Sequence, residues 1–314
     1  MSLKYQWDII GHDKALMALE GDMGHGNVAH AYLFAGPDHV GKYSVAKRFA
    51  HLLQCENGFC GECHVCQEIE KGYHADTVEM ADNGESVKIE QIRGVLDRLN
   101  MTRQGAYKVF LLDNIERMTL ESANALLKTL EDPPDGVIFL LTTSRLKEII
   151  PTILSRVRLL KMSRLTDNAM TQLLEKHFPL AEKEITDTVS SLALGRPGKA
   201  LALLNDPQLY DQYRKMYGDI EMFLRQPDRV NQFLYIEELS ASAKEEKSQR
   251  LIQEFLDIFQ FVLRKELLLA SRGERGIFPP EKLLRLLEQV RKTQELLKRN
   301  VNARLLLENM MLSL

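Results

Sequence analysis

The chain has 314 residues, of which 45% are hydrophobic and 27% are charged, and its formal net charge is −3 at pH 7. This composition is typical of a globular protein with two or three domains, and it excludes a global basic field that would attract nucleic acid. No apolar run approaches the ~18 residues of a membrane span, and the first ten residues lack the apolar core of a signal peptide, so we expect a cytoplasmic protein without membrane contact.

Residues 1–164 are predicted to form an α/β domain with a mostly parallel sheet. Short apolar runs, typical of buried strands, occupy residues 30–36, 108–116, 136–144 and 156–162. Apolar residues at helical spacing occupy residues 42–54, 89–99 and 120–132. Pro133 and Pro134 end the last of these helices. Strands that alternate with helices favour a parallel sheet.

The stretch FAGPDHVGKYS at residues 34–44 nearly matches a phosphate-binding loop, G-x-x-x-x-G-K followed by Ser or Thr. Gly36, Gly41 and Lys42 stand where the backbone must approach a phosphate and a lysine must neutralise it. Tyr43 replaces the small hydroxyl that binds magnesium, and Ser44 follows one residue late. We expect the inherited loop shape, with ATP or ADP bound weakly or not at all. The alternative is a plain strand–turn–helix junction with a surface lysine.

All four cysteines lie within residues 55–66, at Cys55, Cys60, Cys63 and Cys66. In a cytosolic chain such spacing suits a tetrahedral zinc site better than disulfides, and four protein ligands make the zinc structural. An iron–sulfur cluster is the alternative, since C-x4-C-x2-C occurs in ferredoxins, although that pattern places its fourth cysteine far away. Four free thiols are the remaining possibility.

An acidic residue ends the predicted strand at residues 108–116. Asp113 is in the position of the carboxylate on the metal side of a phosphate-loop site. Asn114 follows it, and an amide cannot act as the base that activates water. The two positions Tyr43 and Asn114 therefore both oppose ATP hydrolysis.

The strand pattern stops after about residue 165, and the rest of the chain is predicted to be helical. Short helices within residues 166–204 would form a lid domain over 165–206, and Asp206 followed by Pro207 marks its end. Residues 207–314 would form an all-α collar domain. Its long helices are expected at residues 247–270 and 281–313, with a loop between them at residues 271–280.

The segment SANALLKTLEDPPDGVIFLLTTSRLKEIIPTILSR at residues 122–156 resembles the bacterial DNA polymerase III clamp-loader ATPase subunits. HAYLFAGP, the four-cysteine insert and the C-terminal KRNVNARLLLENMMLSL extend the resemblance along the chain, and it is strongest with the delta-prime type, a homologue of the gamma/tau motor. The resemblance implies an AAA+ fold with a P-loop domain, a helical lid and a helical collar. It also implies a five-subunit hetero-oligomeric ring, with gamma/tau and delta subunits, that places a sliding clamp on primed DNA.

The resemblance assigns roles to individual residues. Ser155 and Arg156 match a serine–arginine–cysteine motif, with Val157 in place of the cysteine, and the arginine would act in trans on the ATP of a neighbouring motor subunit. A guanidinium suits this role because it stabilises charge developing on the transferred phosphoryl group. A structural arginine at a strand start is the alternative. Thr143 and Ser144 lie in the stretch that senses the terminal phosphate in motor subunits.

The lid segment GRPGKAL at residues 195–201 carries Gly198 where the motor pattern has an arginine, although Arg196 and Lys199 are adjacent. Together with Tyr43 and Asn114, this glycine favours a stator subunit of the DNA polymerase III holoenzyme that donates Arg156 without hydrolysing ATP itself. An active gamma/tau-type ATPase is one alternative. A DNA-binding module that acts alone is another.

Overall fold

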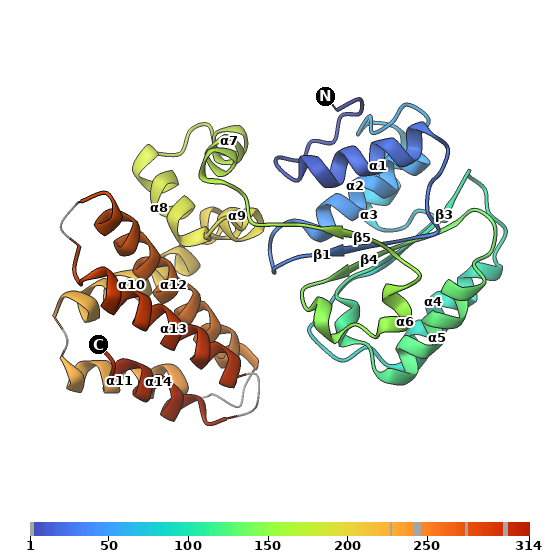
Figure 1. The fold of residues 1–314 in the computed structure, drawn as a ribbon. Coiled ribbons are helices and arrows are strands. Elements are labelled where there is room, and N and C mark those ends of the chain that lie inside the picture. Colours follow the sequence, from blue (N-terminus) through green and yellow to red (C-terminus); the bar gives the residue numbers. More distant parts are fainter. Residues whose placement is uncertain (1–2, 227, 242–245, 274–275, 298–300) are drawn as a thin grey trace. The chain divides into compact units, whose positions relative to one another are not determined.

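The computed structural model describes residues 3–226, 228–241, 246–273, 276–297 and 301–314 (Figure 1). The chain divides into two compact units: unit 1 runs to Thr186 and includes Gly195–Leu201, and unit 2 comprises Asp187–Leu194 and Ala202–Leu314. The finer division into three domains, with boundaries at residues 164 and 206, stays a prediction. None of the described helices is long and apolar enough to cross a membrane.

Unit 1 is built on a sheet of five parallel strands in the order β2-β3-β4-β1-β5, which confirms the α/β class. The strands are β1 (Ala31–Ala35), β2 (Thr77–Met80), β3 (Lys108–Leu112), β4 (Val137–Thr143) and β5 (Arg158–Lys161). Four of them lie within predicted apolar runs. Strand β2 was not predicted, because its four residues TVEM at the sheet edge include a glutamate and form no apolar run.

Helices cover both faces of the sheet (Figure 1). Alternate residues of the interior strand β1 enter different cores: Tyr32 and Phe34 pack on one face, and Ala31 and Leu33 pack on the other. This double burial explains why the strands read as continuous apolar runs in the sequence. The covering helices are α1 (Asp13–Gly24), α2 (Lys42–Gln54) and α3 (His64–Lys71) on the first face, and α4 (Ile89–Asp97), α5 (Leu120–Glu131) and α6 (Pro151–Leu154) on the second.

The remaining described elements are helical, as predicted. Short helices follow β5 at α7 (Asp167–His177), α8 (Lys183–Ala193) and α9 (Pro197–Asn205). Unit 2 continues with α10 (Pro207–Arg225), α11 (Arg229–Ser240), α12 (Glu246–Ser271), α13 (Pro280–Leu297) and α14 (Ala303–Met311). The helix expected over 281–313 is divided into α13 and α14, because the Asn302 side chain accepts a hydrogen bond from the Leu305 N–H and caps a new helix. Residues 298–300 lie outside the described residues.

Candidate functional site

The phosphate-loop residues lie at the carboxyl edge of the sheet, between β1 and α2. Gly36 follows β1, and a Cβ atom there would lie 2.3 Å from the carbonyl oxygen of Met162, so only glycine fits. Gly41 precedes α2 with φ of 94°, in the left-handed region that favours glycine. Both end glycines are therefore explained by backbone geometry, and they bring Lys42 to the first position of the helix.

Lys42 is engaged by groups of its own chain. Its side chain is buried, and Nζ donates hydrogen bonds to the Pro37 carbonyl and to Ser144 Oγ, each at 3.0 Å. The Asp38 carboxylate lies 3.9 Å from the same nitrogen and accepts a short hydrogen bond from Ser144 Oγ. Burial lowers the pKa of Lys42, and nearby carboxylates, first Asp38, oppose that shift. The lysine that would neutralise a phosphate is thus held by an internal carboxylate and hydroxyl.

Tyr43 points to the edge strand β2 instead of offering a small metal-binding hydroxyl. Its phenol donates a 2.5 Å hydrogen bond to Glu79 Oε2 on β2, and Lys47 Nζ lies 3.5 Å from the same oxygen. Burial, followed by the hydrogen bond to Glu79, raises the pKa of Tyr43, so the phenol stays protonated at neutral pH. Ser44 is exposed on α2, and no described contact joins it to the other candidate residues.

Asp113 is half-buried beside Thr142 at the ends of β3 and β4. Its carboxylate accepts a short hydrogen bond from Thr142 Oγ1, and burial raises its pKa. The next residue, Asn114, donates from Nδ2 to Asp82 Oδ2 at 2.7 Å. An amide held by Asp82 occupies the place of a second carboxylate. The neighbouring Thr143 Oγ1 accepts the Arg145 N–H at 3.1 Å, so its hydroxyl closes the turn after β4.

Gly198, the lid residue that stands where an arginine was expected in a motor subunit, lies against the phosphate loop. The Gly198 N–H donates to the His39 carbonyl at 2.9 Å, and a Cβ atom at Gly198 would come within 3.2 Å of that oxygen. His39 itself has φ of 62°. Arg196 and Lys199 are both buried. A large side chain at position 198 would therefore require the loop to move.

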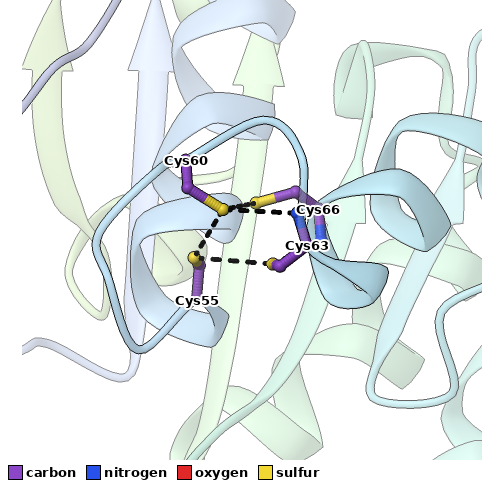
Figure 2. Close-up of side chains that lie close together, drawn as sticks. All are labelled: Cys55, Cys60, Cys63 and Cys66. Atoms are coloured by element: carbon purple, nitrogen blue, oxygen red, sulfur yellow. Dashed lines mark hydrogen bonds between the residues drawn. The ribbon is translucent and has the colours of Figure 1, made fainter.

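The four cysteines converge at the end of α2 and the start of α3 (Figure 2). Cys55 Sγ lies 3.8 Å from the sulfurs of Cys60 and Cys63, and Cys60 Sγ lies 3.9 Å from Cys66 Sγ. All four sulfurs lie within 4.8 Å of one another. A tetrahedral ion with metal–sulfur bonds of about 2.3 Å has sulfur–sulfur edges of about 3.8 Å. The cluster could therefore hold one metal ion, as the spacing predicted.

Backbone N–H groups surround the sulfurs. Cys63 Sγ accepts from the Cys66 N–H, and Cys60 Sγ accepts from the Cys63 N–H, each at 3.4 Å. The Cys63 N–H, ahead of the Glu62 N–H, lowers the pKa of Cys60 to about 6, whereas burial raises the pKa of Cys66 to about 12. A metal bound here would have to displace the Cys66 proton, since thiolates are the ligands. His64 is exposed, as expected for a residue outside the ligand set.

Arg156 lies at the opposite, amino edge of the sheet. It precedes β5, which pairs with β1 from Tyr32 to Ala35, whereas the phosphate loop leaves β1 after Ala35. At roughly 3.3 Å per residue, the length of β1 puts about 16 Å between the two levels. The arginine is thus remote from the loop of its own chain. Ser155 follows α6 and donates from Oγ to the Thr152 carbonyl at 2.9 Å.

The family model for the DNA polymerase III delta subunit matches residues 11–166, which contain all of these residues except Arg196, Gly198 and Lys199 of the lid segment. Escherichia coli DNA polymerase III subunit tau is 42% identical over 154 residues. Pseudomonas aeruginosa DNA polymerase III subunit delta' is 36% identical over 156 residues, and Bacillus subtilis subunit tau is 31% identical over 265 residues. Over residues 11–166, the chain belongs to the DNA polymerase III clamp-loader family.

The clamp-loader relatives differ from this chain in extent. The alignment with the E. coli protein covers 48% of this chain and 24% of the relative. The alignment with the P. aeruginosa protein covers 48% and 47%, and that with the B. subtilis protein covers 81% and 46%, in the same order. The chain thus spans between about a quarter and about half of these curated relatives. Solved structures matched include a DNA polymerase III gamma subunit-related protein of Thermotoga maritima (TM-score 0.46, 20% identity, 93% of this chain and 97% of that one). The RuvB branch migration motor of the same organism also matches, with a TM-score of 0.48 and 16% identity over 77% of this chain and 85% of that one.

Several residues of this clamp-loader chain were missed by the sequence analysis. Asp38 and Glu79 were not named, yet they engage Lys42 and Tyr43. Ser144 was named for phosphate sensing only, and its link to Asp38 spans 106 residues. No motif marks such pairs, because each arises where separate strands end at the same sheet edge. In the sequence, the one signal for these contacts was Asp38, an acidic residue inside the phosphate-loop motif.

Proposed function

We propose that this clamp-loader family member is a subunit of the delta-prime type, which does not hydrolyse ATP itself and donates Arg156 to the ATP site of a neighbouring motor subunit. The observation that carries the proposal is the 2.5 Å hydrogen bond from Tyr43 to Glu79. A phenol directed at β2 cannot supply the compact hydroxyl that binds magnesium in a phosphate-loop enzyme.

Two further features support the absence of turnover. Asn114 offers an amide where hydrolysis needs a base, and its Nδ2 is bound to Asp82. Gly198 supplies no guanidinium to sense the nucleotide, and a Cβ atom at this position would lie 3.2 Å from the His39 carbonyl oxygen, so an arginine there would require the phosphate loop to shift. The internal contacts of Lys42 compete with any phosphate that enters the loop. Nucleotide binding is accordingly expected to be weak or absent.

The location of Arg156 supports action in trans. The residue lies at the amino edge of the sheet, away from the loop of its own chain, and its side chain is about one-third exposed, at 34%. In an assembly with gamma/tau and delta subunits, it would reach a partner's nucleotide and stabilise charge on the transferred phosphoryl group. The proposed partners are therefore other clamp-loader subunits in a five-membered ring, and through them a sliding clamp and primed DNA.

Zinc is the metal we propose for the four-cysteine centre. Sulfur separations of 3.8–3.9 Å fit one tetrahedral ion, and four thiolates leave no open position for a substrate. An iron–sulfur cluster would attach its cysteines to more than one iron and would spread the sulfurs further apart. The ion would fix the loop between α2 and α3 and would take no part in chemistry.

An active gamma/tau-type motor is the second candidate, because the chain retains Gly36, Gly41 and Lys42 and is 42% identical to a tau subunit over 154 residues. ATP turnover by the purified chain alone separates the two. The stator proposal expects no turnover by the chain, and a large fall in the ATPase of a reconstituted clamp loader when Arg156→Ala is introduced. Arg93→Ala, at an exposed arginine on α4, is the matched control. Motor-like turnover by the isolated chain would refute the proposal.

A further inference from the structure

The Arg156 guanidinium is held at two of its nitrogen atoms. Nη1 donates to the Thr152 carbonyl at 2.9 Å and to Ser155 Oγ at 3.0 Å, and both of these acceptors belong to the local turn. Nη2 lies 2.9 Å from Oε1 of Glu131, at the end of α5 and 25 positions earlier in the sequence. Glu131 is therefore the one long-range contact of the guanidinium among the residues that the structure describes.

Two anchored nitrogens fix a planar group in a way that one cannot. With Thr152 and Ser155 alone, hydrogen bonds would hold the guanidinium only at Nη1, and the group could still tilt about the line from Nη1 to Nε, where it joins the side chain. The carboxylate of Glu131 adds a second, charge-assisted contact at Nη2 and so determines the plane of the group. Because a phosphate is recognised by the orientation of the planar fork, fixing the plane matters for catalysis more than adding a contact.

The bond to Glu131 leaves donors available. A guanidinium has five N–H groups, and the contacts with Thr152, Ser155 and Glu131 engage three of them. In the described part of the chain, the Nε–H and one N–H of Nη2 have no protein acceptor. These two donors could bind oxygens of a partner's phosphate while Glu131 stays in place. Glu131 can thus orient the arginine without withdrawing it.

We propose that Glu131 is the positioning residue that orients Arg156 for a partner's ATP, an inference that rests on the proposed trans function. The pair is partly exposed, with 34% of the Arg156 side chain and 48% of the Glu131 side chain accessible. Exposed ion pairs contribute little to stability, so the contact's effect belongs to catalysis and not to folding. Asp132, the next residue, is exposed and has no described contact with Arg156, which makes it a matched control.

The test is steady-state ATP hydrolysis by a reconstituted clamp loader that contains this chain, with kcat and KM measured separately. Glu131→Ala is expected to lower kcat by about 10- to 100-fold, the effect of misplacing a reacting group by about 1 Å, with KM changed by less than about twofold. Glu131→Asp should recover part of the loss, and Asp132→Asn should match wild type. The double variant with Arg156→Ala should be no slower than Arg156→Ala alone.

Each outcome bears on a separate claim. If Arg156→Ala slows the complex but Glu131→Ala does not, or accelerates it, the positioning role is overturned and the trans function stands. If Arg156→Ala leaves the rate unchanged, both claims are overturned. Gel filtration of each complex and a thermal melt of each isolated chain distinguish a catalytic loss from failed assembly or folding. A loss of kcat with unchanged assembly and unchanged melting temperature supports Glu131 as the positioning residue.

Discussion

The two edges of the parallel sheet in unit 1 carry the two groups of candidate residues, and those residues are engaged differently. At the carboxyl edge, Lys42 and Tyr43 are bound by Ser144 and Glu79 of the same chain. At the amino edge, Arg156 is held at two nitrogens and keeps two N–H donors without a partner among the described residues. Because opposite ends of a strand are built by different loops, one edge can lose its chemistry while the other retains its own.

The largest effect should come from a substitution that keeps the charge at the amino edge. Arg156→Lys retains a cation but loses the planar fork and the two-point attachment. We expect the ATPase of the reconstituted complex to fall on the order of 10³-fold, the lower range for an arginine that stabilises phosphoryl transfer. Single-turnover kinetics would check this. A rate close to wild type would show that charge alone suffices and would weaken the contrast between the edges.

Substitution of a cysteine in the proposed zinc site should strongly lower the affinity for metal. It should have little effect on the ATPase activity that depends on Arg156. Cys66→Ser removes one of the four sulfurs proposed to hold the zinc, and we expect metal affinity to fall by more than about 100-fold, because losing even an outer-shell partner costs 10- to 100-fold. Competition with a chromophoric chelator would measure the change, and elemental analysis of wild type should give one zinc per chain. His64→Ala, at an exposed residue beside the ligands, is the control and should leave affinity unchanged.

Substitutions that make the phosphate loop at the carboxyl edge more like the full motif are expected to have a smaller effect, on nucleotide binding. Asp38→Ala with Tyr43→Thr frees Lys42 from its internal carboxylate and returns a small hydroxyl to the loop. We expect magnesium–ADP binding to tighten by about 10-fold, the effect of about one charge-assisted hydrogen bond. Isothermal titration calorimetry would detect this. Strong nucleotide binding by the unmodified chain would show that the internal contacts do not block the loop.

The smallest effect is on stability, at Asp113. Burial raises the pKa of this carboxyl in the folded chain, so the fold disfavours its ionised form. The penalty is absent below the unfolded pKa of about 3.8, where both states are protonated, and is complete above the raised folded pKa. Asp113→Asn should therefore raise the melting temperature at pH 7 and leave it unchanged near pH 3. An equal change at both pH values would contradict this origin.

The sequence predicted the features that depend on local pattern. The buried strands, the two loop glycines, the helical C-terminal half and the cluster of four cysteines that could hold a metal ion all follow from spacing within a few residues. The contacts between distant segments could not be predicted. Lys42 meets Ser144 across 102 positions, and Gly198 meets His39, because separate loops end at one sheet edge. Strand β2 was missed because it is short and carries polar residues at the sheet edge.

The strand order has a consequence for synthesis on the ribosome. Strand β1 is an interior strand of the sheet, and both of its partners, β4 and β5, lie roughly a hundred residues or more further along the chain. At about 5–20 residues per second, β1 would wait roughly 5–20 s for its first neighbour to be translated. Its apolar residues are exposed during that interval, and non-local pairing is slow to form. We therefore expect the nascent segment around β1 to be a target for chaperones during synthesis.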